Sequence, residues 1–321
     1  EFEPHRELYD WFLDAISPLK GIRPKQREFS RLNLSYTITS KRKLALLVEE
    51  NMVEGWDDPR MPTISGLRKR GYTPESLKNF ALTVGISKRE NVIDASLLEF
   101  CIRTHLNQIA PRAMAVLDPI KIRIINYKNE GGEKIDFDIN PQEKELGTRE
   151  INFSKELYIE NEDFQEDPEE GFFRLSLGEE VRLKNAYIIK AVDLVKDVKG
   201  NIIEVLCEYD KKSKSGSNTP ESNRRVKGTV HWVSAADTVK ARINVYDRLF
   251  KVPEPGKGGD LKGEVNENSL EIKEAYVEPY LAESTEGQQY QFQRLGYFVR
   301  TANKKTLEFN KTVGLRDGWK K

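Results

Sequence analysis

The stretch Ile120–Ile124, IKIRI, alternates apolar and basic residues, and Ile135–Ile139, IDFDI, alternates apolar and acidic residues. Alternation with period two is typical of a β-strand that buries one face. The segment between the two stretches contains Gly131-Gly132, so we expect them to form a hairpin. Here the chain changes from helical periodicity to strand periodicity.

On the N-terminal side of this change, residues 1–110 are predicted to be mostly helical. Apolar residues at helical spacing indicate an amphipathic helix over Pro4–Ile16. The sequence TPE at 73–75 combines a capping hydroxyl, a first-turn proline and an acid, and so predicts a helix that ends at Gly85. A wide apolar stripe predicts a further helix that ends before Pro111.

On the C-terminal side, many short strands favour barrels or sandwiches. The sequence DVKGN at 197–201 predicts a turn between two strands, and the polar KKSKSGSNTPESN at 211–223 predicts an exposed hairpin tip. The predicted strands are Ile151–Phe153, Leu157–Ile159, Glu180–Leu183, Tyr187–Val195, Ile202–Tyr209 and Gly228–Val233.

Composition limits the possible functions only in part. The 321 residues suffice for two or three domains, and 52 basic residues balance 52 acidic ones, so net charge neither favours nor excludes a polyanionic partner. No apolar run approaches the ~20 residues that a membrane helix needs. The three histidines are scattered and suggest no metal site, while Cys101 and Cys207, as two lone thiols, fit a reducing cytosol. We therefore predict a cytoplasmic protein.

The stretch Tyr36–Leu44, YTITSKRKL, places Ser40, Lys41 and Arg42 between two apolar runs. Taken alone, such a stretch is most simply a solvated basic turn. The alternative is a flexible loop whose lysine approaches a triphosphate and neutralises the charge that grows in the transition state.

This lysine stretch resembles the KMSKS-type loop of class I aminoacyl-tRNA synthetases, in the degenerate form of the bacterial glutaminyl type. The resemblance extends over essentially all 321 residues. It is carried by EFSRLNLSYTITSKRKL, VEGWDDPRMPTISGLRKRGYTPESL, APRAMAVLDPIKI, GEEVRLKNAYIIKA, KGTVHWVSA and NKTVGLRDGW.

The resemblance implies a multidomain α + β fold, in which a remnant of the class I catalytic fold and a helical subdomain precede two antiparallel β-barrels. Residues 1–30 would be the C-terminal remnant of the Rossmann catalytic domain, and residues 31–110 the KMSKS-type loop and helical subdomain. The proximal anticodon-binding barrel would consist of 111–145 and 240–321, and the distal barrel of 146–239.

The resemblance also implies that Ser40, Lys41 and Arg42 bind ATP phosphates, with Lys41 as the catalytic lysine. The sequence departs from the family at Thr39, where methionine is usual. No His-x-Gly-His sequence occurs, and in the family this motif and the glutamine pocket lie upstream. We therefore expect the chain to hold no cofactor by itself, ATP and Mg²⁺ to serve the full-length enzyme, and ATP and glutamine to bind only together with that N-terminal region.

The anticodon of tRNA(Gln) is the implied partner of the barrels. Proteins usually read unpaired bases by stacking and by hydrogen bonds to base edges, which suits arginine and glutamine side chains. At period two, Arg182 and Lys184 would project from one strand face, although Lys184 lacks the guanidinium fork of the relatives. Without the resemblance, each of these residues is more simply a solvated surface residue. The implied anticodon-binding residues are Arg112, Arg174, Arg182, Lys184, Gln291, Arg294 and Thr312.

Two alternatives remain. A barrel-type glutamyl-tRNA synthetase shares this architecture, and a free-standing RNA-binding module would have lost catalysis. We expect a monomer with no membrane contact. As part of a glutaminyl-tRNA synthetase, the chain alone would bind tRNA without catalysing the ligation.

Overall fold

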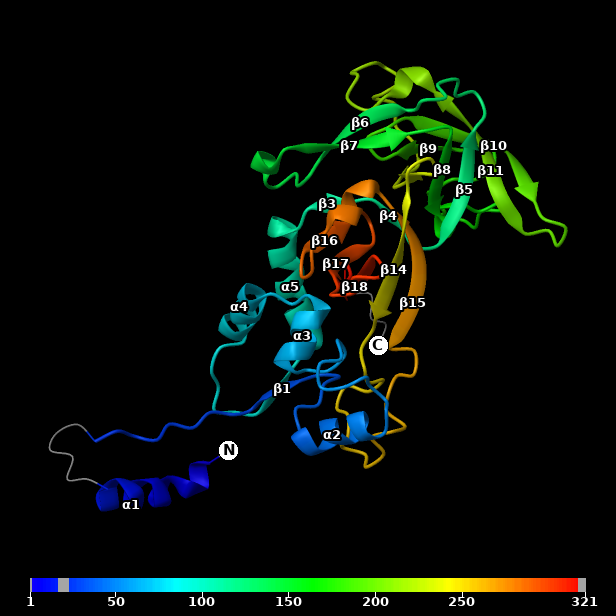
Figure 1. Ribbon diagram of the computed structural model, residues 1–321. Coiled ribbons are helices and arrows are strands. Elements are labelled where there is room, and N and C mark those ends of the chain that lie inside the picture. The colour runs from blue at the N-terminus through cyan, green and yellow to red at the C-terminus, as the bar shows by residue number, and fades with distance from the viewer. Residues whose placement is uncertain (1, 17–22, 317–321) are drawn as a thin grey trace.

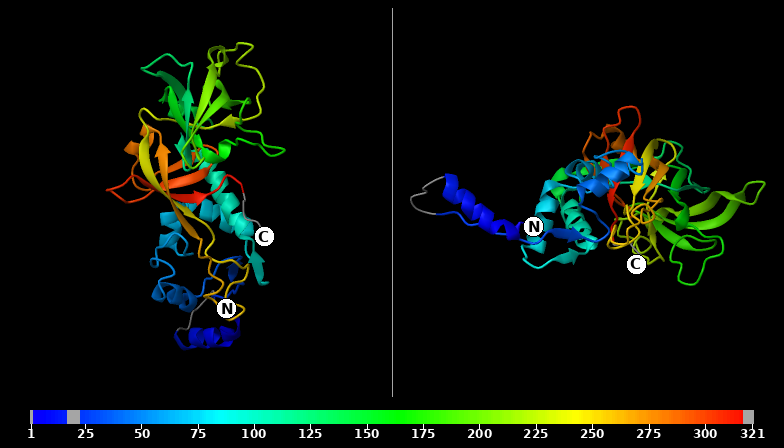
Figure 2. Two further views of the ribbon diagram at one scale, coloured as in Figure 1. Left: turned by 90° about the vertical axis from the view of Figure 1, so that its right-hand side faces the viewer. Right: turned by 90° about the horizontal axis from the view of Figure 1, so that it is seen from below.

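The structure is a computed structural model that describes residues 2–16 and 23–316. Figure 1 shows an elongated arrangement with α1 (Arg6–Ile16) at one end, helices and a β-rich unit in the middle, and a second β-rich unit at the other end; the left view of Figure 2 shows the same order. A one-turn helix, η1 (Glu3–His5), precedes α1. None of the helices in these two ranges is long and apolar enough to cross a membrane.

The helical region lies between α1 and the β-rich units. Two short parallel strands pair within it: β1 (Leu32–Leu34), which precedes α2, and β2 (Asn91–Ile93), which precedes α5. The predicted start at 73–75 is confirmed, because the Thr73 hydroxyl accepts a hydrogen bond from the Ser76 amide and Gly85 follows the last turn. Its helices are α2 (Lys41–Glu49), α3 (Ile64–Arg70), α4 (Pro74–Val84) and α5 (Ala95–Ile109).

The first β-rich unit, the proximal unit, is a seven-stranded sheet with the order β3-β16-β17-β18-β14-β15-β4. Its two end strands are separated in the chain only by Met114, so the sheet curls until its ends meet at one segment, as in a barrel. Its strands are β3 (Arg112–Ala113), β4 (Ala115–Val116), β14 (Val239–Tyr246), β15 (Leu270–Val277), β16 (Gln289–Phe292), β17 (Gly296–Arg300) and β18 (Glu308–Val313), with η5 (Pro279–Glu283) after β15.

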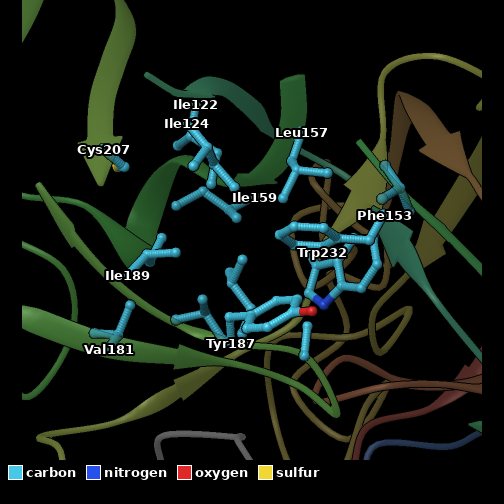
Figure 3. Packing of buried hydrophobic residues seen from close by; sticks show 14 of the residues in the cluster. Ile122, Ile124, Phe153, Leu157, Ile159, Val181, Tyr187, Ile189, Cys207 and Trp232 are labelled. Atoms are coloured by element: carbon cyan, nitrogen blue, oxygen red, sulfur yellow. The ribbon is translucent and has the colours of Figure 1, made fainter. Parts of the chain in front are cut away.

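The second, the distal unit, has the strand order β12-β9-β10-β11-β5-β8-β13 and an added pair, β6-β7. Its end strands are likewise separated only by His231 and Trp232, so this sheet closes in the same way. Figure 3 shows its core, where Trp232 packs edge-on against Phe153 with ring centroids 5.4 Å apart. Its elements are β5 (Pro119–Ile124), β6 (Glu133–Asp138), η2 (Lys144–Leu146), β7 (Thr148–Phe153), β8 (Glu156–Glu160), η3 (Asn161–Asp163), β9 (Glu180–Leu183), β10 (Ile188–Lys196), β11 (Ile202–Asp210), η4 (Lys211–Ser213), β12 (Thr229–Val230) and β13 (Val233–Ser234).

The hairpin predicted between Ile120–Ile124 and Ile135–Ile139 is wrong. β5 pairs with β8 and β11, whereas β6 pairs with β7. The connection over residues 125–132 is longer than the about two to five residues of ordinary hairpin loops, so it lets β6 leave the edge of β5. The range 111–145 assigned to the proximal barrel is therefore too long, because only β3 and β4 belong to that unit and the chain crosses to the distal unit after β4.

Two further predictions need correction. The barrels are not purely antiparallel, because β5 runs parallel to β11, and β14 runs parallel to β18. The polar segment 211–223 is not a hairpin tip, because it connects β11 to β12, which have β9 and β10 between them in the sheet. Ser213 and Ser222 of this segment are buried, so it lies against the unit rather than projecting from it. The turn predicted at 197–201 does join β10 to β11.

Candidate functional site

The lysine stretch begins a helix. Ser40 is the N-cap residue of α2, with extended backbone and no capping bond from its side chain, and Lys41 and Arg42 form the exposed first turn. Within residues 2–16 and 23–316, neither Lys41 nor Arg42 has an ion-pair or hydrogen-bond partner for its side-chain cation. Both cations are thus available to an anionic ligand.

A pocket of about 400 Å³ lies beside this stretch. One side is formed by Thr37–Ser40 and Lys43, and the other by β2 and the segment around Pro253–Pro255. Lys43 crosses between the two sides, because its Nζ donates a hydrogen bond of 2.9 Å to the carbonyl of Gly256. The pocket therefore joins the helical region to the connection between β14 and β15.

The same connection provides the core on which α2 rests. Leu44 and Leu47 are buried against Leu249 and Phe250, which follow β14. The Tyr36 amide also donates to the carbonyl of Pro253 at 2.8 Å. The position of the lysine stretch consequently depends on residues about 200 positions later in the sequence.

Arg112 and Gln291 are neighbours, as their parallel pairing in β3 and β16 requires. Arg112 is buried, and its guanidinium donates to the carbonyls of Ala110 and Asn107 at 2.8 and 2.9 Å. These are carbonyl groups at the C-terminal end of α5, where a cation is favoured. Burial lowers the pKa of Arg112. Gln291 donates to the Tyr297 hydroxyl at 3.1 Å. In this structure the Arg112 guanidinium binds the helix end, so its contact with RNA stays a prediction.

Arg174 and Arg294 come from different units and meet at one carboxylate, that of Asp163. Arg294, in the turn between β16 and β17, binds both carboxylate oxygens, with Nη1–Oδ2 and Nη2–Oδ1 distances of 2.5 and 2.7 Å. Nη1 of Arg174 lies 2.8 Å from Oδ1 of the same group and 3.0 Å from Glu162. Burial alone would lower the pKa of Arg294, but the hydrogen bond and charge of Asp163 raise it.

Arg182 and Lys184 differ in their surroundings. The Arg182 guanidinium donates to the carbonyls of Ser213, Ser222 and Arg224 at 3.2, 2.6 and 3.3 Å, and so holds the segment 213–224 in place. Burial and the nearby Arg224 charge lower the pKa of Arg182. Lys184 lies one residue beyond β9, and no ion-pair partner of its ammonium occurs in the described part of the chain.

Thr312 is buried in β18, and its hydroxyl faces the end of α3. A Cβ placed on Gly71, which ends α3 with a φ of 92°, would collide with the Thr312 hydroxyl. That hydroxyl is buried without a hydrogen-bond partner in the described ranges. The structure therefore places Thr312 at a packing contact between α3 and the proximal unit.

The sequence prediction missed the residues that orient these side chains. Asp163 holds two of the predicted arginines, and Asn107 accepts hydrogen bonds from Arg112 and Tyr297. No motif marks either residue, because Asp163 stands in an acidic run and Asn107 lies on the polar side of a helix. Only the fold brings them to the arginines.

Three segments of the chain match known families. Residues 1–108 match "tRNA synthetases class I (E and Q), catalytic domain", and residues 110–210 and 229–301 match two families described as "tRNA synthetases class I (E and Q), anti-codon binding domain". The catalytic match includes the helical region that the sequence prediction assigned to a separate subdomain beside a short remnant at 1–30. The match to the catalytic-domain family thus extends well beyond that remnant.

Curated relatives match along the whole chain. Proteins named glutamine–tRNA ligase from Shigella boydii serotype 18 and Escherichia coli O157:H7 are each 50% identical to it over 324 aligned residues. The alignments cover 100% of this chain and 58% of each relative. The chain therefore spans somewhat more than half the length of these relatives.

Proposed function

We propose that this chain carries class I (E and Q) tRNA synthetase domains, as the family matches indicate. From this premise we propose that it is the part of a glutamine–tRNA ligase that binds the anticodon and supplies the lysine stretch. The observation that carries this proposal is the 50% identity to glutamine–tRNA ligases along all of the chain. The identity includes both β-rich units and the helical region, so it supports a shared arrangement of RNA-binding and catalytic segments.

The tRNA-binding part of the proposal rests on the two β-rich units. Guanidinium and amide groups of Arg174, Arg182, Gln291 and Arg294 lie in these units, and such groups can read base edges. We propose that they recognise the anticodon of tRNA(Gln). Binding of a tRNA(Gln) transcript should weaken as salt rises, with a log–log slope of roughly 0.7–0.9 per phosphate contacted. Salt-independent binding would refute an electrostatic RNA surface.

The catalytic part of the proposal concerns the lysine stretch. Lys41 and Arg42 are exposed at the first turn of α2. They do not line the 400 Å³ pocket but directly follow Ser40, which does, and they are suited to neutralise triphosphate charge as the adenylate forms. We propose that ATP, Mg²⁺ and glutamine are bound only when a His-x-Gly-His segment and a glutamine pocket complete the site. Glutamine-dependent exchange of pyrophosphate into ATP should therefore be undetectable with these 321 residues alone, and robust exchange would overturn this assignment.

Glutamate is the nearest alternative to glutamine, because the families matched include both specificities. The relatives named above favour glutamine. Binding of tRNA(Gln) and tRNA(Glu) transcripts to the chain distinguishes the two, since preference for tRNA(Glu) would contradict the proposal. We also propose a cytoplasmic monomer, in keeping with two buried cysteines that form no disulfide. Light scattering coupled to size exclusion tests the monomer.

A further inference from the structure

Asp163, at the end of η3, has a carboxylate with none of its side-chain surface exposed, yet it binds two partly exposed arginines. The side chains of Arg174 and Arg294 keep 36% and 28% of their surface exposed. A guanidinium carries five N–H donors. Asp163 accepts hydrogen bonds from two donors of Arg294, and it forms an ion pair of 2.8 Å with Nη1 of Arg174, whose hydrogen bonds go to Glu162. The carboxylate thus holds the Arg294 guanidinium by two hydrogen bonds and places its charge beside Nη1 of Arg174, while both side chains stay partly exposed.

The two arginines come from separate units. Arg174 belongs to the distal unit, next to Leu175, whose amide donates to the backbone carbonyl of Asp163 at 3.0 Å. Arg294 belongs to the proximal unit, where its backbone has a φ of 66°, a left-handed conformation unfavourable for a side chain with Cβ. The bidentate hydrogen bonds from Arg294 to Asp163 offset this strain, because they hold the turn against the distal unit.

A second buried group supports Arg294 from the other side. Nδ1 of His231 lies 3.2 Å from Nη1 of Arg294, and Nε2 of His231 lies 3.3 Å from a Glu160 oxygen. Arg294 can only donate and the carboxylate can only accept, so both contacts fit a neutral imidazole with its proton on Nε2. The two oxygens of Glu160 also accept the amides of Leu117 and Asp118, where the chain crosses between the units.

We propose that Asp163 is a positioning residue for anticodon recognition: it does not touch RNA, but it sets the orientation in which Arg174 and Arg294 meet the bases. This inference rests on the proposed function. A bidentate contact between a guanidinium and a base edge requires a defined plane and discriminates between bases, whereas a contact with a phosphate contributes affinity without sequence information. Loss of Asp163 should therefore reduce base discrimination more than overall RNA affinity.

The competing interpretation is that the carboxylate only masks the arginines, as a competitor of RNA. Removing it would then raise affinity for every RNA and leave discrimination unchanged. A purely structural role would lower affinity for every RNA by the same factor. The ratio of the affinity for the cognate anticodon to the affinity for a substituted anticodon separates both interpretations from a positioning role, because only a positioning role changes it.

The experiment compares Asp163→Asn with Asp167→Asn in the full 321-residue chain. Asp167 is exposed on the segment that follows η3, so its substitution makes the same change in charge without touching either arginine. Filter binding measures a tRNA(Gln) transcript with the CUG anticodon and transcripts with the second or third anticodon base replaced. We expect Asp163→Asn to lower the cognate-to-substituted ratio by roughly tenfold, the worth of one good guanidinium–base contact, and Asp167→Asn to leave it unchanged.

The outcomes are distinct. An unchanged ratio with Asp163→Asn overturns the positioning role, whether the affinities all rise, all fall or stay constant. If Asp163→Asn abolishes the folded circular dichroism signal, Asp163→Glu keeps the charge but displaces both guanidinium groups, and an unchanged ratio there overturns the role equally. Absence of any discrimination by the unsubstituted chain refutes the proposed function instead.

Discussion

Arg149 and Glu278 form a buried ion pair between the distal and proximal units, and replacing Arg149 by methionine tests how strongly the units depend on it. Their side chains are 7% and 1% exposed, and Nε of Arg149 lies 2.8 Å from a Glu278 oxygen. The arginine also lies over the rings of Phe137 and Tyr280. Methionine keeps most of this apolar stem, so the substitution removes the charge and one hydrogen bond of 3.0 Å from Nη1 to the Asp138 carbonyl.

The expected loss follows from what remains after the substitution. The pair is incompletely satisfied, because Oε2 of Glu278 and Nη2 of Arg149 have no hydrogen-bond partner in the described residues. The pair itself therefore adds little net stability, but removing one partner leaves a buried charge uncompensated, which costs about 3–5 kcal/mol. We expect Arg149→Met to lower the free energy of unfolding by about 3 kcal/mol at pH 8.

The loss should depend on pH. Burial raises the pKa of Glu278 above its ordinary value, although Arg149 opposes the shift. A carboxyl whose folded-state pKa is raised contributes stability below its unfolded-state pKa and loses that contribution as pH rises through the folded-state pKa. Without Arg149 the pKa of Glu278 should rise further. The loss in free energy of unfolding of Arg149→Met should therefore shrink as pH falls from 8 towards 5, by at most about 1.4 kcal/mol per pH unit.

Urea unfolding followed by circular dichroism at pH 5, 6, 7 and 8 measures these free energies. The matched control is Arg123→Met on the same unit, because Arg123 is 42% exposed and its partner Glu204 keeps Lys121 as a second cation. The control should lose no more than about 1 kcal/mol. The double variant Arg149→Met with Glu278→Met should regain most of the loss. Equal losses in the two single variants, or no recovery in the double variant, would refute the reasoning.

Three further substitutions test local features. Arg182→Ala should release the carbonyls of the segment 213–224 and speed amide hydrogen exchange there, while exchange in the core strands stays slow. Gly71→Ala should lower the free energy of unfolding by about 2 kcal/mol or more, because the new Cβ meets Thr312 and the backbone φ is positive. Thr73→Ala should cost about 1 kcal/mol through loss of the α4 cap, measured by thermal unfolding, and a serine in its place should restore the cap.

Local patterns predicted the elements better than their partners. The capping hydroxyl of Thr73 and the alternation of Ile120–Ile124 depend only on nearby residues, and both elements occur where the sequence places them. The partner of β5 could not be predicted in this way, because alternation defines a buried face but not which strand lies beside it. In the structure β5 pairs with β8 and β11, and its apolar face joins the distal core.

At the candidate site, too, the sequence indicated individual residues better than their contacts. The resemblance identifies which side chains to examine, but it predicts a flexible loop at Lys41, whereas Lys41 begins the exposed first turn of α2. It does not reveal that Arg112 is buried against the end of α5, or that Arg174 and Arg294 share Asp163. Such contacts join residues from different units, and no periodicity or spacing along the chain encodes them.

The balance of 52 basic and 52 acidic residues acquires a physical meaning from these contacts. Acidic groups such as Asp163 and Glu162 lie beside arginines of the predicted RNA surface, so their charges orient cations rather than cancel them at random. Lys41, Arg42 and Lys184 have no such partner among the described residues. Attraction of a polyanion over a distance should depend mainly on unpaired cations, whereas discrimination between bases should depend on the paired arginines, whose geometry the carboxylates restrict. Net charge therefore says little about RNA binding here, because acids such as Asp163 and Glu162 lower the total while lying beside the guanidinium groups.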